Sequence, residues 1–233
     1  MPKITSVEVQ KKNPHRFNIY LDDQFAFGAD EDLVVNQRLI KGKEIASQDL
    51  DKLLFEAEVG KLMDRIYGLL GRRARSEKEI RDYLRNLSFK RKIKDQSGLS
   101  EVVIESLIKR LINKGLINDL DFAKAWVESR RKTKKKGQQG LKAELYQKGI
   151  SKDIIDQVFE QLLTLEMVGE EQLAEEVVIK KLDSWKNLPP MEKRQKALQF
   201  LVRRGFDYDL SRDIVEKITK KEYNTDGQKG SEV

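Results

Sequence analysis

A short pattern of one glycine, one apolar residue and one Ser or Asp occurs three times along the chain, each time followed by apolar residues at helical spacing. The copies begin at Gly98, Gly149 and Gly205, with periods of 51 and 56 residues. The glycine suits the residue that closes one helix, and the Ser or Asp suits the N-cap of the next. The apolar positions that follow are Val103, Leu107 and Leu111, then Ile154, Val158 and Leu162, then Leu210, Ile214 and Ile218. Because they recur at every fourth residue, each set predicts a helix with one buried stripe.

Each repeat unit is predicted to hold three helices. In the second and third units, apolar residues also stand four and eight positions before the glycine; these are Leu145 and Leu141, then Leu201 and Ala197. Ile80 and Leu84 take the same places in the first unit if Ser88–Ser97 is an insertion. Units of this size cannot each bury their own apolar face, so we expect them to stack into an elongated array that suits an extended partner.

The first unit contains two further helix signals. The apolar residues of Asp49–Leu70, among them Leu53 and Leu62, have a period of 3.6 and predict one long helix. Ser76 followed by Glu79 has the spacing of a capping box, in which each residue satisfies a backbone N–H of the other. This pair predicts the start of the next helix.

The N-terminal segment has a two-residue period instead. Ile4–Gln10, Phe17–Leu21 and Gln24–Phe27 predict three strands of a small β-meander, with a turn over Lys11–Pro14 and a short helix over Asp30–Asn36. We therefore predict a mainly α protein in which three three-helix repeats follow this meander. The expected boundaries are a β-rich extension over 1–48, repeats over 49–115, 116–166 and 167–221, and a flexible tail over 222–233.

Composition narrows the functional classes. The chain has 233 residues, of which 39% are apolar, so it can bury real cores. It contains no cysteine, which excludes disulfides, thiolate chemistry and Cys-ligated zinc. No apolar run is long enough to span a bilayer, and the N-terminus has no signal-peptide pattern. We expect a cytoplasmic monomer that does not engage a membrane.

The positive charge is gathered in two clusters. Lys and Arg total 46 against 39 Asp and Glu. Arg72–Lys94 holds ten basic and three acidic residues, and Ser129–Lys136 holds six basic residues in eight positions, whereas Ser151–Trp185 has a net charge of −6. Charge runs commonly form solvated faces, and cations near a helix C-terminus gain only a few tenths of a kcal/mol. Six neighbouring like charges repel one another, so a polyanion or an acidic protein surface is the expected partner. The candidate contact residues are Arg72, Arg73, Arg75, Arg130, Arg131, Lys132, Lys134, Lys135, Lys136 and Lys148.

The sequence contains few residues in patterns suited to catalysis, and no motif predicts a cofactor or a metal site. The only histidine, His15, lies in the turn predicted within the meander. Gly42-Lys43 lacks the upstream glycine and the following Ser or Thr of a phosphate loop. The acidic residues Glu170, Glu171, Glu175 and Glu176 have the spacing of a solvated helix face. Among the aromatics, Phe122 and Trp126 could stack on bases, but core packing is the favoured role, as it is for Trp185.

Two stretches resemble the RecX family of recombination regulators. The first is Gly71–Ile80 with Leu84. The second runs from Gly115 to Ile150 and contains Gly115–Asp119, Phe122-Ala123, Trp126-Val127, Arg130, Lys136-Gly137, Leu141, Leu145 and Lys148–Ile150. The insertion Ser88–Ser97 departs from the family pattern.

The resemblance implies tandem three-helix repeats and a non-enzymatic protein that binds RecA recombinase filaments along their helical groove. Such a protein inhibits filament growth, ATP hydrolysis, strand exchange and the coprotease activity that cleaves repressor, and so acts in DNA repair and the SOS response. The basic clusters would also allow contact with single- or double-stranded DNA. Two other hypotheses stay open: a general nucleic-acid-binding helical protein, and a metal-dependent nuclease that uses the acidic helix.

Overall fold

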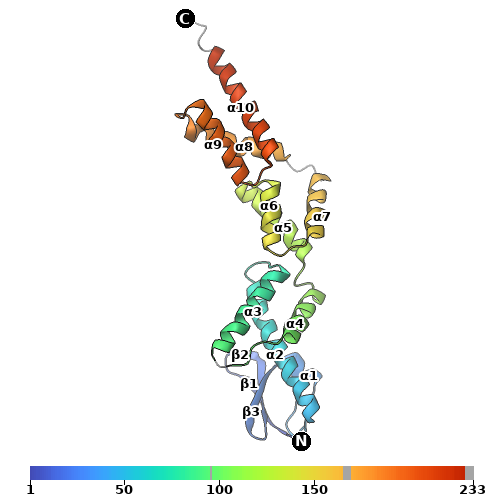
Figure 1. The fold of residues 1–233 in the computed structure, drawn as a ribbon. Helices are drawn as coiled ribbons and strands as arrows, with labels where there is room; N and C mark the ends of the chain where they lie inside the picture. Colours follow the sequence, from blue (N-terminus) through green and yellow to red (C-terminus); the bar gives the residue numbers. More distant parts are fainter. Residues whose placement is uncertain (95, 165–168, 229–233) are drawn as a thin grey trace. The chain divides into compact units, whose positions relative to one another are not determined.

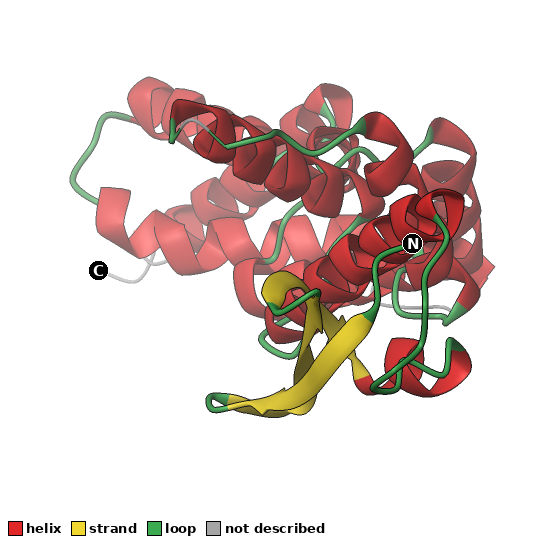
Figure 2. Cartoon of the chain, turned by 90° about the horizontal axis from the view of Figure 1, so that it is seen from below, coloured by secondary structure: helices red, strands yellow, loops and turns green. Residues whose placement is uncertain are grey.

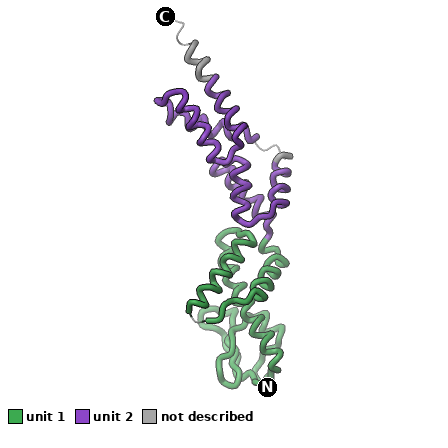
Figure 3. Tube along the Cα trace, viewed as in Figure 1, with its two compact units in different colours: residues 1–117 green, residues 118–233 purple. Residues whose placement is uncertain are grey.

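The computed structural model describes residues 1–94, 96–164 and 169–228, and most of these residues are helical (Figure 1). The chain divides into two compact units, residues 1–117 and 118–233, which are described separately below (Figure 3). No helix among the described residues is both long enough and apolar enough to cross a membrane.

The first unit opens with a three-stranded antiparallel sheet in the order β1-β2-β3 (Figure 2). Its strands are β1 (Ile4–Gln10), β2 (Asn13–Leu21) and β3 (Gln24–Asp30). Asp22 and Asp23 connect β2 to β3 with φ of 48° and 66°. Two successive residues at positive φ are typical of the tightest hairpin turns, in which Asp is tolerated. The predicted meander is thus confirmed.

Two details of the meander were predicted wrongly. The turn after β1 is shorter than expected because β2 begins at Asn13, so His15 lies on a strand. Its side chain is 80% exposed and its Nδ1 lies 3.3 Å from Glu31 Oε2. β3 continues to Asp30, whose carboxylate then caps α1 (Glu31–Asn36) by accepting a hydrogen bond from Leu33 N.

The long helix α2 (Ser47–Leu70) links the sheet to the first three-helix repeat. Its N-terminal half packs on the sheet through residues such as Leu53 and Ala57. Its C-terminal half packs on α3 (Glu77–Ile93) and α4 (Glu101–Asn113). The buried residues of this second core include Leu62, Ile66, Ile80, Leu84, Val103, Leu107 and Leu111. The stripe predicted after Gly98 is therefore confirmed.

The start of α3 is as predicted, but its end is not. The Ser76 hydroxyl accepts a hydrogen bond from Glu79 N at 3.3 Å, which confirms the predicted N-cap. Gly98 does not close this helix, because α3 ends at Ile93, within the predicted insertion. Gly98 also lacks a positive φ, and its neighbour Leu99 donates its N–H to Ser88 Oγ at 2.8 Å.

The second unit holds the other two repeats. The second repeat consists of α5 (Asp119–Lys134), α6 (Gln138–Gln147) and α7 (Lys152–Thr164). The third consists of α8 (Glu170–Leu182), a 3-10 turn (Asp183–Trp185), α9 (Pro190–Arg203) and α10 (Tyr208–Gln228). Gly149 and Gly205 follow α6 and α9 with φ of 82° and 84°, the left-handed conformation predicted for them. The last helix reaches Gln228, so the backbone of the predicted tail is helical up to there.

The aromatic residues of the second unit pack in or against the hydrophobic cores, as predicted from the sequence. Phe122 is buried in the core of the second repeat and stacks on Trp126, with ring centroids 5.7 Å apart. Trp185 meets Phe200 edge to face at 5.7 Å beside the core of the third repeat. These rings therefore stabilise the two helical cores.

Candidate binding surface

The three candidate contact residues of the first cluster, Arg72, Arg73 and Arg75, lie in the loop between α2 and α3 and have different environments. Arg73 donates two hydrogen bonds to the Glu79 carboxylate, at 2.7 and 3.1 Å, and this pairing raises the pKa of Arg73. The Nε of Arg75 is buried and has no hydrogen-bond partner in the described part of the chain. Arg72 is exposed. The structure therefore leaves Arg72 as the open cation of the three.

The second predicted cluster contains cations that hold helices together. Glu144 on α6 pairs with both Arg130, whose Nε lies 3.1 Å from Oε2, and Lys136. The same carboxylate accepts a hydrogen bond from Trp126 Nε1 at 2.8 Å. Burial alone would raise the pKa of Glu144, but the hydrogen bonds from Lys136 and Trp126 outweigh it, and the pKa is lowered. Glu144 thus fixes the end of α5 to α6.

Cations also cover the indole of Trp126. The Arg130 guanidinium carbon lies 4.4 Å from the ring centroid, and Lys148 Nζ lies 4.9 Å from it. Contacts of this kind are favourable cation–π interactions. Because Phe122 stacks on the same ring, Trp126 is a packing centre rather than a platform for a base. Arg130, Lys136 and Lys148 therefore have structural contacts, as Arg73 does through Glu79.

We expect Glu144→Gln to lower the free energy of unfolding by about 1–3 kcal/mol at pH 7, because it removes the charge that Arg130 and Lys136 share. Glu144 has a lowered pKa in the folded protein, so its carboxylate stabilises the fold above its ordinary titration range, and this contribution is lost as the pH falls. The difference between variant and wild type should therefore shrink below about pH 5. Urea unfolding at pH 7 and pH 4 measures it.

Glu128→Gln is the matched control, because Glu128 is an exposed carboxylate on α5. It removes the same charge without touching the Trp126 contacts. Equal losses in both variants, or a Glu144→Gln loss independent of pH, would contradict this assignment.

The acidic residues of α8 lie on a partly exposed face, as predicted, but they also pair with groups on neighbouring helices. Glu176 pairs with Lys135 and Lys180, and these contacts lower its pKa to about 2. Glu171 and Glu175 pair with Lys217 of α10, at 3.1 and 2.6 Å. Glu170 accepts a hydrogen bond from Gln138 N at 2.6 Å. These carboxylates connect α8 to α5, α6 and α10.

A groove in the second unit brings together cations from three helices. Its volume is about 620 Å³, and we call it the basic groove. It is lined by Thr133, Lys134, Lys135, Lys136, Val177, Lys180, Lys181, Phe200, Arg203 and Arg204. Seven of these residues are Lys or Arg, and no acidic side chain lines the groove. Lys180, Lys181, Arg203 and Arg204 were not among the predicted contact residues, although each lies in or just after the last turn of its helix.

The remaining predicted residues, Arg131, Lys132 and Lys134, lie on α5, and of these three only Lys134 lines the groove. Lys132 is exposed, and Arg131 is half-buried with an Nε that has no hydrogen-bond partner among the described residues. Lys134 is exposed, and its carbonyl oxygen accepts a hydrogen bond from Arg204 Nη1 at 2.7 Å. The six-residue cation run is therefore divided between structural contacts and the groove.

Three glycines set the position of the groove walls. Gly137 N donates to Arg204 O, and Gly140 N donates to Gly205 O, both at 3.1 Å. A Cβ added to Gly205 would lie closer than 3.0 Å to the Cα and N of Gly140. Only glycine therefore allows the loop after α9 to pack directly on the start of α6. This junction holds the second repeat against the third.

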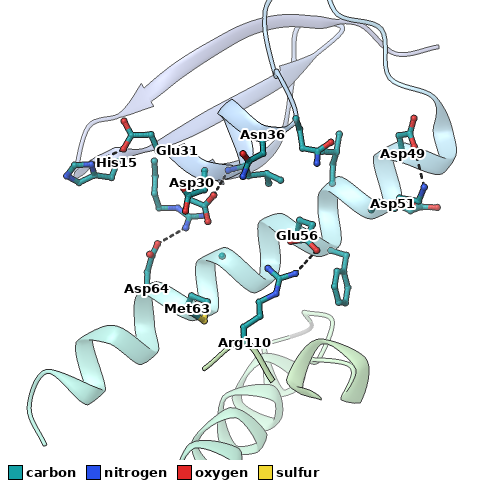
Figure 4. Close-up of a pocket in the computed structure, with 18 of the residues that line it drawn as sticks. His15, Asp30, Glu31, Asn36, Asp49, Asp51, Glu56, Met63, Asp64 and Arg110 are labelled. Atoms are coloured by element: carbon teal, nitrogen blue, oxygen red, sulfur yellow. Dashed lines mark hydrogen bonds and ion pairs between the residues drawn. The ribbon is translucent and has the colours of Figure 1, made fainter. Parts of the chain in front are cut away.

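A larger cavity of about 1080 Å³ lies in the first unit, between the sheet, α1, α2 and α4 (Figure 4). Several of its charged side chains are paired with one another. Arg16, whose side chain is 9% exposed, binds Asp64 at 2.6 Å, and Arg110 binds Glu56 at 2.6 Å (Figure 4). The contrast with the acid-free lining of the basic groove makes that groove the better candidate for a charged partner.

Comparison with family models gives three matches. The description "Regulatory protein RecX N-terminal domain" matches residues 2–46, "RecX, second three-helix domain" matches residues 118–158, and "RecX, third three-helix domain" matches residues 169–215. The last two ranges hold the basic groove and the glycines of the junction described above.

Relatives with the same description align along most of the chain. "Regulatory protein RecX" of Bacillus velezensis is 35% identical over 98% of this chain and 81% of its own length, and that of Bacillus subtilis is 36% identical over 97% and 80%. A crystal structure of regulatory protein RecX is similar with a TM-score of 0.69 at 28% identity, covering 93% of this chain and all of that chain. A crystal structure of RecX from Lactobacillus salivarius gives 0.56 at 26% identity, covering 68% and 95%.

Proposed function

The chain belongs to the RecX family of regulatory proteins, and we propose that it regulates RecA recombinase by binding RecA filaments on DNA in the cytoplasm. In this proposal it inhibits filament growth, ATP hydrolysis, strand exchange and coprotease activity by binding alone. The observation that carries the proposal is a tandem helical array with an acid-free basic groove between two repeats. A filament presents repeated protein and phosphate surfaces, so several moderate contacts can act together.

A RecA ATPase titration tests this proposal. With filaments assembled on single-stranded DNA, added protein should lower ATP hydrolysis reversibly, without a cofactor of its own. Its affinity for filaments should exceed its affinity for the same DNA by about 10-fold or more, because linked contacts raise the effective concentration. Further DNA added to the assay should not restore hydrolysis if the protein binds the filament rather than the free strand.

Two outcomes would contradict the proposal. Unchanged ATP hydrolysis at saturating protein would remove RecA as the partner. Equal affinity for filaments and for naked DNA would favour the alternative, a general nucleic-acid-binding protein, which the basic groove also supports. DNA recovered intact from the same mixtures, with a divalent metal present, is expected for a protein that acts by binding.

A further inference from the structure

We propose that the C-terminal end of α3 binds an acidic segment of a partner protein that also carries apolar side chains. The surface consists of two exposed apolar residues, Phe89 and Ile93, and three exposed lysines, Lys90, Lys92 and Lys94; we call it the α3 patch. It lies in the first unit and shares no residue with the basic groove, so the inference does not rest on the proposed function.

The predicted insertion builds this patch by lengthening α3. In the second repeat, α6 ends at Gln147, two residues after the buried Leu145. In the first repeat, α3 continues to Ile93, nine residues after Leu84, which takes the equivalent place. The α3 patch lies at the end of this added length, and neither of its apolar residues belongs to the core of the repeat.

Phe89 and Ile93 face away from that core. Both are 65% exposed, and they stand four residues apart, so they are neighbours on one face of the helix. The buried Ile80 and Leu84 lie on the opposite face, as a period of 3.6 residues places them. Single exposed apolar residues are common on protein surfaces, whereas two adjacent ones form a patch that a partner can cover.

The end of α3 is held in place without a partner. Arg91 pairs with Glu58 of α2. Ser88 Oγ accepts a hydrogen bond from Leu99 N at 2.8 Å, and a Cβ added to Gly98 would lie 2.9 Å from the same hydroxyl. Because the segment before α4 packs on the helix in this way, a ligand does not have to order the patch, and less conformational entropy is lost on binding.

The lysines of the patch exceed what the helix end requires. Lys90, Lys92 and Lys94 have no carboxylate partner among the described residues. The C-terminus of α3 carries roughly half a negative charge, so about 2.5 of their three positive charges are left without compensation. These charges surround two apolar side chains, and the complementary ligand therefore carries carboxylates beside apolar side chains.

Three other ligands fit the patch less well. A nucleic acid stacks its bases on aromatic rings, but Ile93 has no flat face to offer and phosphates would leave it uncovered. A helix that lies on a membrane presents a long apolar face, whereas this patch has two apolar residues. A second copy of this chain would have to bring a free acidic surface, and carboxylates of α8 already pair with lysines of the same chain.

A selection from a displayed random-peptide library tests the chemistry of the ligand. The target is the full-length wild-type protein, and peptides that also bind the double variant Phe89→Gln, Ile93→Gln are removed first. The peptides that are left should be enriched in Asp and Glu next to Leu, Ile or Phe. No enrichment over the starting library, or enrichment of peptides without acidic residues, would overturn the proposal.

The tightest selected peptide, carrying a fluorescent label, then measures the two parts of the patch. Its affinity should fall roughly 10- to 100-fold in the double variant, because the burial of two apolar side chains is lost. Replacing Lys90, Lys92 and Lys94 by Gln should lower the affinity roughly 3- to 10-fold near 0.15 M salt and make binding less dependent on salt. Thermal stability should stay at the wild-type value in both variants, because the replaced side chains are exposed.

Matched controls come from the same unit. Val35→Gln with Ile40→Gln removes two apolar side chains that are 67% and 65% exposed. Replacing Lys11, Lys12 and Lys41 by Gln removes three exposed lysines. Both controls should bind the peptide like wild type, and losses equal to those of the patch variants would contradict the assignment.

The other ligands are distinguished in the same assay. Displacement of the peptide by oligothymidylate, or by vesicles of anionic lipid, as effectively as by unlabelled peptide would assign the patch to that ligand instead. Dimers of the wild-type protein that dissociate in the double variant would assign it to a second copy of the chain. RecA is absent throughout, so the result is separable from that of the ATPase titration.

Discussion

Gly205→Ala is expected to destabilise the second unit by about 2–5 kcal/mol, one of the two largest effects anticipated for this protein. Gly205 has φ of 84°, a left-handed conformation that costs a residue with a Cβ about 1–2 kcal/mol. The new Cβ would also collide with backbone atoms of Gly140, which cannot rotate away as a side chain could. Relieving that collision must move the loop after α9 away from α6, and so lose the hydrogen bond from Gly140 N to Gly205 O.

Gly115→Ala is the matched control for this effect. Gly115 also has a positive φ, 66°, but a Cβ there would meet nothing within 4 Å. It should therefore show the conformational cost alone, and the difference between the two variants isolates the contact between the repeats. Urea unfolding measures both. Equal destabilisation by the two variants would mean that the junction accommodates the added Cβ at Gly205 without a further loss of stability.

The local features of the fold could be predicted from the sequence because each depends on residues that are close together in the chain. The Ser76 cap, the left-handed glycines Gly149 and Gly205 and the buried stripes follow from spacing within one or two turns. Gly98 was assigned wrongly because the insertion lengthens α3 and moves its end away from the glycine. Spacing alone does not reveal how an inserted segment divides between helix and loop.

The candidate site was harder to predict because its charges are paired across long sequence separations. Lys135 meets Glu176, and Arg204 reaches the carbonyl of Lys134. A run of six cations therefore looks uniform in the sequence, while the fold divides it between ion pairs and an open groove. The groove residues that were not predicted lie at the ends of α8 and α9. Only the packing of the repeats brings these helix ends beside α5.

Ending the chain after residue 164 should lower affinity for RecA filaments roughly 10- to 1,000-fold, because it removes one of several linked binding units. The truncation also removes Lys180, Lys181, Arg203 and Arg204, and so leaves the basic groove with one wall. The fragment keeps α5, α6 and α7 with their own core, so helicity should be retained in the part that is left.

Two causes of this loss can be separated by comparing the fragment with the full-length variant in which Lys134, Lys181 and Arg203 are Gln. If the third repeat contributes mainly groove charge, the two proteins should inhibit RecA ATP hydrolysis equally. If it also contacts the filament through other surfaces, the fragment should be the weaker inhibitor, and this is the result that we expect from linked binding. Full inhibition by the fragment would assign the third repeat to stabilising the second, through the glycine junction and the Lys135–Glu176 ion pair, rather than to binding RecA.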